Sequence, residues 1–166
     1  MLIAALALAL TSGLVSAASL DRADADFLAQ AARADRAEIE GCQLALKQSH
    51  HAEVRTLAQQ ILTEHQQTAQ ELAALAASKG VKLPEKSTLI QATKLKALSL
   101  AQHEFDVKFV KSIGVDAYAE EERLYFKAST EAGDAEVRAF AARTLPIVEK
   151  RLDAAQKLLL VLDKDV

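Results

Sequence analysis

His65, in the stretch LTEHQQTAQEL, is the residue of this sequence best suited to chemistry. It falls on the apolar face of a predicted helix, where an imidazole would be buried. Ile61 and Leu72 fall on the same predicted helix face. A buried imidazole can bind a metal or act as a hydrogen-bonded core group. Helical bundles build carboxylate-bridged metal sites from Glu-x-x-His motifs, but Leu62 stands three positions before His65. The sequence therefore excludes that motif here and leaves both roles open.

Carboxylates on two other predicted helices could meet His65 in the interior. Glu38 falls on the inner half of the first helix, and the third offers Asp116 with either Glu120 or Glu121. Imidazole and carboxylate ligands together suit iron and several other transition metals. One hypothesis is therefore a metal site, for iron or another transition metal, made of His65, Glu38, Asp116 and Glu121.

Arg151 offers those carboxylates a different partner, because it precedes Leu152 on the buried stripe of the last predicted helix. A guanidinium stays protonated, so it could pair with a carboxylate that would be costly to bury alone. It would also oppose cation binding at the same place. The favoured hypothesis is therefore a structural polar layer without a cofactor, in which Glu38 and Arg151 lie within hydrogen-bond reach of His65. Its members are Glu38, His65, Thr68 and Arg151.

Other reactive residues have simpler interpretations. Cys42 is the only cysteine and lies on an apolar helix face, so we expect a core residue. His50 and His51 fall in a predicted turn, and His103 with Asp106 falls near a helix start. The sequence contains no CxxCH motif, nucleophile elbow, P-loop or dinucleotide-binding glycine pattern.

The composition predicts the all-α class for the elements that position these residues. Hydrophobic residues make up 51% of the 166 residues but aromatics only 4%, with 5 glycines and 2 prolines. Alanine and leucine are abundant, and both favour helix. The net charge is -3 with both signs interspersed, so the chain lacks the basic stripe of a nucleic-acid-binding protein.

Hydrophobic periodicity predicts four long helices and one short one. The first ends near Gln48, the second ends at Gly80, and Gly133 followed by Asp134 separates the third from the fourth. After the linker 81–88, a helix at 89–100 precedes the long helix 102–131. One long connection between two tightly turned halves predicts a ferritin-like four-helix bundle.

The first eighteen residues have the pattern of a secretory signal peptide. They are uncharged, with an apolar run followed by small residues up to Ala17 and Ala18. We expect cleavage there, which leaves a bundle domain at 19–166 with no membrane span; the alternative is a retained anchor. The predicted location is periplasmic or secreted.

Five stretches along the chain form a recognisable series: DADFL (24–28), AEIEGCQLAL (37–46), LTEHQQTAQELAALAASKGVKLP (62–84), EFDVKFV (104–110) and FAARTLPIVEKRL (140–152). In their order and spacing they resemble a family of secreted proteins, the domain of unknown function family 4142. The resemblance covers nearly the whole predicted domain. It implies a ferritin-like bundle in the periplasm or associated with the outer membrane, and it implies no established enzyme activity.

The resemblance also implies three histidine positions, of which this sequence keeps one. Glu64-His65 matches the acidic-His pair of the second helix. The third helix has Ala117 or Ala119 where a histidine would fall, and the fourth has Arg151. We therefore expect a non-catalytic bundle that acts structurally or binds an unknown protein or envelope partner. The alternative is a degenerate ferritin-like metal-binding protein or oxidoreductase.

Overall fold

The computed structural model describes residues 20–164, which form a four-helix bundle and contain no strand. The predicted all-α fold is therefore confirmed, whereas the predicted signal peptide lies outside the described residues. A 3₁₀ turn at Gln102–Glu104 precedes α4, and a π-helical segment at Val110–Asp116 joins α4 to α5 without a break. The helices are α1 (Arg22–Gln48), α2 (Ala52–Ser78), α3 (Leu89–Ser99), α4 (Phe105–Phe109), α5 (Ala117–Glu131) and α6 (Ala135–Leu162).

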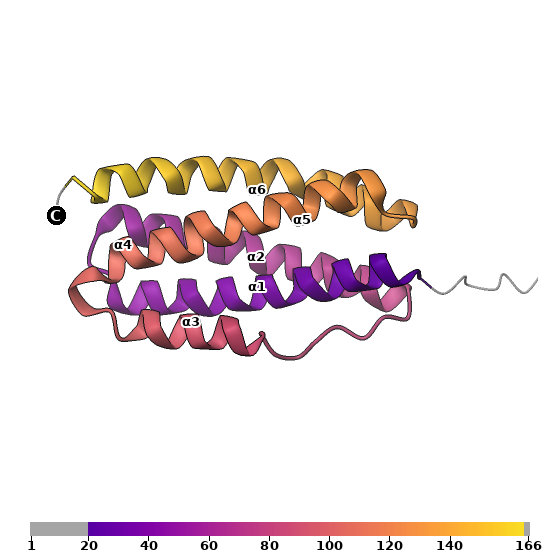
Figure 1. The fold of residues 1–166 in the computed structure, drawn as a ribbon, viewed down its shortest axis with the longest axis horizontal. Helices are drawn as coiled ribbons and strands as arrows, with labels where there is room; N and C mark the ends of the chain where they lie inside the picture. Colours follow the sequence, from indigo (N-terminus) through magenta and orange to yellow (C-terminus); the bar gives the residue numbers. More distant parts are fainter. Residues whose placement is uncertain (1–19, 165–166) are drawn as a thin grey trace, which may run out of the picture.

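The order of the long helices gives the bundle its ferritin-like topology. A short turn joins α1 to α2 at one end, and another joins α5 to α6 at the opposite end (Figure 1). Between these pairs, the linker and α3 run back along the bundle, so that α2 and the α4–α5 helix start at the same end (Figure 1). This single long crossover confirms the predicted arrangement.

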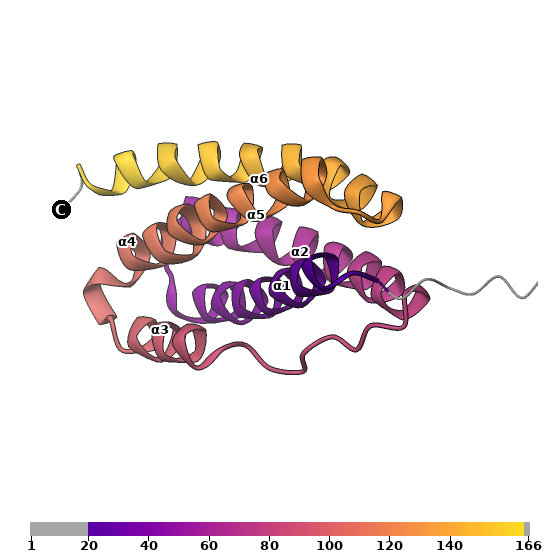
Figure 2. The same ribbon diagram turned by 45° about the vertical axis from the view of Figure 1, so that its right-hand side comes forward.

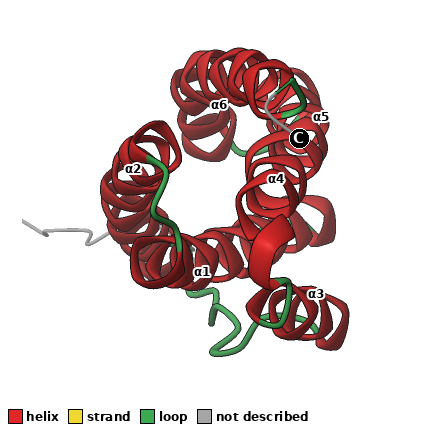
Figure 3. Ribbon diagram, turned by 90° about the vertical axis from the view of Figure 1, so that its left-hand side faces the viewer, coloured by secondary structure: helices red, strands yellow, loops and turns green. Residues whose placement is uncertain are grey.

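The short helix α3 lies outside the ring formed by α1, α2, α6 and the α4–α5 helix (Figure 3). It packs beside α1 and α4, as a second view also shows (Figure 2). Thr88 and Gln91 form a capping box that starts α3, but Leu98 is its only buried residue. The bundle core therefore forms almost without α3.

The helices end at residues that commonly cap helices, although Ser49 caps the end of α1 and not the start of α2. Asp21 and Asp134 accept backbone hydrogen bonds as N-caps of α1 and α6, and Gly80 has a φ of 69° just beyond α2. Serine is a common N-cap and would suit the start of α2, but Ser49 instead ends α1, and its hydroxyl accepts from the backbone N–H of His51. The predicted break near residues 99–103 is confirmed, with Gln102 at a φ of 43°.

The core is mostly apolar, and it is tightly packed where α6 meets the π-helical segment. Tyr118, Tyr125 and Phe140 are among its largest fully buried side chains, and Cys42 is also buried. A Cβ atom on Gly114 would lie 2.8 Å from the Ala155 Cβ, so this close helix contact requires glycine. Within the described residues, no helix is both long and apolar enough to cross a membrane.

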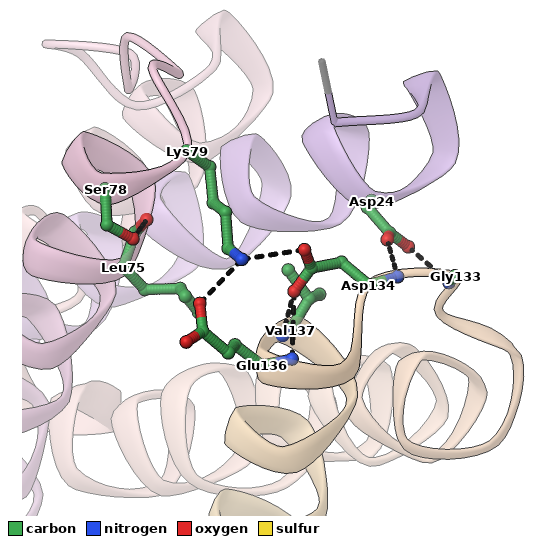
Figure 4. A network of polar contacts seen from close by, with 8 residues as sticks. All are labelled: Asp24, Leu75, Ser78, Lys79, Gly133, Asp134, Glu136 and Val137. Atoms are coloured by element: carbon green, nitrogen blue, oxygen red, sulfur yellow. Dashed lines mark hydrogen bonds and ion pairs between the residues drawn. The ribbon is translucent and has the colours of Figure 1, made fainter. Parts of the chain in front are cut away.

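A polar network, here named the turn network, ties the α5–α6 turn to α1 and α2 (Figure 4). The buried Asp24 carboxylate accepts from the backbone N–H groups of Gly133 and Asp134, at 3.2 and 2.7 Å. Asp134 accepts from the N–H groups of Glu136 and Val137. Lys79 donates from α2 to the carboxylates of Asp134 and Glu136, at 2.7 and 2.6 Å. The network therefore joins three helices at one end of the bundle.

Candidate metal site in the bundle core

His65 lies at the centre of a buried polar group, here named the core cluster, which consists of Asp35, Glu38, His65, Tyr118 and Glu121. The imidazole is 6% exposed. Its Nδ1 lies 2.6 Å from a carboxylate oxygen of Asp35, and its Nε2 lies 2.8 Å from the hydroxyl of Tyr118. Nε2 also contacts the Glu38 carboxylate. Three helices therefore meet at one histidine.

The carboxylates of the core cluster come from α1 and α5. Asp35 and Glu38 stand three residues apart on one face of α1, and Glu121 faces them from α5. All three are at most 3% exposed. Within the described residues, four buried carboxylate oxygens have neither a hydrogen-bond donor nor an ion-pair contact: Asp35 Oδ2, Glu38 Oε1 and both oxygens of Glu121. The other Glu38 oxygen, Oε2, contacts His65 Nε2. This is far from the usual state of buried polar atoms, which nearly always have partners.

The electrostatics of the core cluster favour bound positive charge. Burial raises the pKa of Glu121 well above its ordinary value of 4.5, and the Glu38 charge raises it further. Burial also raises the pKa of Glu38, against the lowering effect of His65. For His65, burial would lower the pKa, but Glu38 and Asp35 outweigh it and raise the pKa well above 6.5. The cluster therefore holds protons unless another cation neutralises it.

The arrangement fits the ligand set of a transition metal. Asp35, His65 and Glu121 each offer a ligand atom, and these atoms lie within 4.8 Å of one another. Asp35 engages Nδ1, as carboxylates do when they orient a metal-binding histidine. Nε2, which faces Glu38, is then the nitrogen that could bind a metal. Of the four residues predicted for a metal site, His65 and Glu121 belong to this set, and Glu38 adjoins it through its contact with His65 Nε2.

Asp116, the fourth predicted ligand, lies on the surface, where it accepts from Lys111 Nζ at 3.0 and 2.9 Å. The π-helical segment explains this correction. Phe109 and Ile113 face the core, and two α-helical turns beyond them an uninterrupted helix would place Asp116 and Glu120 inside. The wider π turn adds a residue, which moves these positions to 117 and 121. Glu121 is accordingly buried, and next to the half-buried Ala117 it is Tyr118 that faces the core.

Arg151 also departs from the predicted polar layer. It is 8% exposed, but its guanidinium pairs with both carboxylate oxygens of Glu64 and donates to the side-chain oxygen of Gln60 at 3.0 Å. Glu64 is one residue before His65 and therefore points about 100° away from it around α2. The guanidinium meets Glu64 on that side and does not pair with Glu38.

Thr68 lies next to the core cluster rather than inside it. It is half-buried and lines a cavity of about 10 Å³ with His65, Tyr118 and Glu121. That volume is close to what one water molecule needs. Of the four residues predicted for the polar layer, Glu38 and His65 are in contact, Thr68 is adjacent, and Arg151 is paired elsewhere.

Two members of the core cluster, Asp35 and Tyr118, are not among the residues predicted from the sequence. Asp35 could have been found, because it precedes Glu38 by three residues and so shares its helix face. Tyr118 could not have been placed by α-helical periodicity from Phe109, because the π-helical segment intervenes. Its hydroxyl is buried, and burial together with Glu38 raises the tyrosine pKa well above 10.0.

Fold and site together define the class: an all-α ferritin-like bundle with one histidine and three carboxylates buried between its helices. The family model of the domain of unknown function DUF4142 matches residues 9–158, and the chain belongs to this family. Among curated proteins, none matches this chain. A solved structure, the crystal structure of a DUF305 fragment from Deinococcus radiodurans, is similar in fold, with a TM-score of 0.75 at 14% identity. The similarity covers 86% of this chain and 98% of that one.

Proposed function

We propose that the protein binds one transition-metal ion in its core, with His65, Glu38 and Glu121 as ligands and Asp35 as the residue that orients His65. The observation that carries the proposal is the set of four buried carboxylate oxygens, on Asp35, Glu38 and Glu121, that have no donor among the described residues. Carboxylates without donors are costly to bury, and a cation shared among them removes most of that cost.

The ion pair of Arg151 supports this proposal over the structural polar layer. A guanidinium beside Glu38 would neutralise the core cluster and exclude a metal. Arg151 instead pairs with Glu64, so His65 is the one cationic side chain among the described residues that contacts the core carboxylates, and it reaches only Asp35 and Glu38. One protonated imidazole cannot balance three ionised carboxylates.

The donor atoms favour iron, manganese or zinc over copper(I). Imidazole and carboxylate ligands suit the first group, whereas copper(I) favours thiolate and thioether sulfur. Cys42 is the nearest candidate for a sulfur ligand, but burial and the nearby Glu38 charge raise its thiol pKa far above the ordinary value of 9.0. A protonated thiol is a poor ligand, so we expect oxygen and nitrogen coordination.

The same proposal covers location and the kind of activity. The N-terminal sequence favours a periplasmic or secreted protein, and the family resemblance favours association with the outer membrane. A single histidine without a Glu-x-x-His motif does not make the carboxylate-bridged two-metal site of oxidative bundles. We therefore propose that the protein binds metal in the cell envelope without catalysing a reaction, and that it interacts there with a partner.

A second candidate is a metal-free polar layer held together by protons. It is favoured by the contacts of His65 with Asp35 and Glu38, which suit a protonated imidazole. In that case Glu121 stays protonated and the protein acts through its surfaces. The two candidates differ in whether a metal can displace those protons.

Native mass spectrometry of the purified protein separates the two candidates. Fe²⁺ under anaerobic conditions, Mn²⁺ and Zn²⁺ are added in turn at one equivalent. We expect one ion per chain for the wild type and for Glu120→Gln, an exposed neighbouring substitution, and none for Glu121→Gln. If the wild type binds no ion, or if Glu121→Gln binds as well as Glu120→Gln does, the metal proposal is wrong.

A further inference from the structure

A cleft of about 430 Å³ lies between α1, α3 and α5 and leads toward the core cluster. Glu38 from α1 and Glu121 from α5 both line it. Their carboxylate oxygens are turned inward and buried, so the cleft ends one side-chain movement short of the proposed ligand atoms. The small side chains of Ala34, Ala37 and Ala117 leave room for the passage.

The other sides of the core cluster are less accessible. Toward α2 and α6, the cavity beside His65 measures only about 10 Å³. A second cleft, of about 370 Å³, lies between α1, α2 and the linker, but Asp35 is the only member of the cluster that lines it. The cleft between α1, α3 and α5 therefore reaches two of the three proposed ligands, and each alternative reaches fewer of them or is much narrower.

Building on the proposed function, we infer that the metal ion reaches and leaves the core through this cleft. The ion is then an exchangeable cargo of the bundle rather than a cofactor enclosed during folding. Rotation of the Glu38 or Glu121 side chain toward the cleft would bring an oxygen to the incoming ion. The cleft would thus allow the protein to bind and release its metal ion reversibly.

The outer wall of the cleft belongs to α3, the least anchored helix of the fold. Ile90, Gln91, Lys94 and Leu95 line the cleft, whereas only Leu98 of α3 is buried. The charged residues that line the cleft besides its two inward carboxylates are Arg33, Lys94 and Glu120. Two cations against one anion at the mouth slow the approach of a metal ion, because like charges repel along the path.

The rate of Co²⁺ uptake, followed by visible absorbance in a stopped-flow instrument, tests the route. Ala34→Leu narrows the cleft, whereas Ala154→Leu adds the same bulk to a half-buried alanine in the groove between α2 and α6, which contains no cluster residue. We expect Ala34→Leu to slow uptake and EDTA-induced release by about tenfold with unchanged equilibrium affinity, and Ala154→Leu to match the wild type.

Lys94→Glu provides a gain in rate that misfolding cannot imitate. It makes the mouth of the cleft acidic, so uptake should become several-fold faster at low salt and the gain should shrink at high salt. If both cleft variants exchange Co²⁺ at the wild-type rate, the route is wrong although the metal site stands. If Ala69→Leu in the second cleft slows exchange while Ala34→Leu does not, the ion passes by Asp35 instead. If the wild type binds no Co²⁺ at equilibrium, the proposed function and the route both fail.

Discussion

The turn network and the core cluster are both built on buried carboxylates, yet they differ in how those carboxylates are satisfied. Asp24 is 2% exposed and Glu121 is 3% exposed, so burial alone does not separate them. Both oxygens of Asp24 accept from backbone N–H groups, whereas neither oxygen of Glu121 accepts a hydrogen bond. Asp134, in the same network, also has Lys79 as a counterion.

The difference indicates what each region is for. Backbone donors and a lysine fix the carboxylates of the turn network in place, and the whole arrangement closes one end of the bundle (Figure 4). In the core cluster, one imidazole contacts Asp35 and Glu38 but not Glu121, and all three carboxylates keep unused acceptor positions among the described residues. A buried acid that is fully bonded stabilises a fold, whereas a buried acid with unused acceptors is a candidate ligand.

The largest expected difference between the two regions is in metal affinity. Asp35→Asn should weaken Co²⁺ binding by about 10- to 100-fold, because the residue orients His65. Asp24→Asn should leave Co²⁺ affinity unchanged, since Asp24 lies in the turn network. Titration followed by visible absorbance measures both affinities, and equal losses in the two variants would erase the distinction.

The next largest effect concerns stability. Asp24→Ala should lower the free energy of unfolding by about 2 to 4 kcal/mol, because two backbone N–H groups near the buried end of α1 lose a charged acceptor. Asp26→Ala, two residues along at an exposed position, should change it by less than about 0.5 kcal/mol. Urea denaturation measures both, and similar values would show that the turn network contributes little.

The two regions should also respond to pH with opposite sign. The pKa of Glu121 is raised on folding, so its contribution to stability is greatest below 4.5 and is lost as pH rises. Hydrogen bonds from Lys79 lower the pKa of Asp134, so its contribution is present above 3.8 and is lost as pH falls.

Denaturation in the presence of EDTA, repeated across pH, checks these signs. Glu121→Gln should make the metal-free protein more stable at pH 7, by about 1 to 2 kcal/mol, because the neutral side chain avoids a buried charge. The gain should vanish near pH 4. Asp134→Asn should instead lose most stability at pH 7 and little in acid. If Glu121→Gln destabilises the metal-free protein at pH 7, the carboxylate already has a partner there.

We expect the smallest effect from substitution of Arg151, which belongs to neither the turn network nor the core cluster. Its pair with Glu64 is bonded through both carboxylate oxygens and partly exposed. Arg151→Met should therefore cost about 1 kcal/mol of stability. Co²⁺ affinity should stay within about twofold of the wild type, because the guanidinium does not contact the core cluster. A marked rise in affinity would show that Arg151 opposes cation binding after all.

The sequence predicted the fold well, because its signals are local. Apolar residues at helical spacing, Gly80 with the linker behind it, and Asp134 after Gly133 each mark an element through short-range chemistry. The ferritin-like order followed from the length of one connection.

The core cluster was predicted only in part, because side-chain partners depend on how helices rotate against one another. His65, Glu38 and Glu121 face the interior, as their positions in the helical pattern predicted. From the sequence alone, Arg151 could pair with Glu38 or with Glu64. Only the packing of α6 against α2 determines that it pairs with Glu64. Asp116 failed for a different reason, since the sequence pattern gives no warning of the π-helical segment that moves it outside.

That π-helical segment makes the composition of the core cluster a matter of helix phase as well as residue choice. The chain carries acids at 116, 120, 121 and 122, and any of them could have faced the interior. One extra residue in the turn at Val110–Asp116 selects Glu121 over Glu120 for the interior. Within the lineage of this bundle, a single insertion or deletion in that turn would exchange the whole inward set of α5 at once, whereas point substitutions would have to replace each member separately.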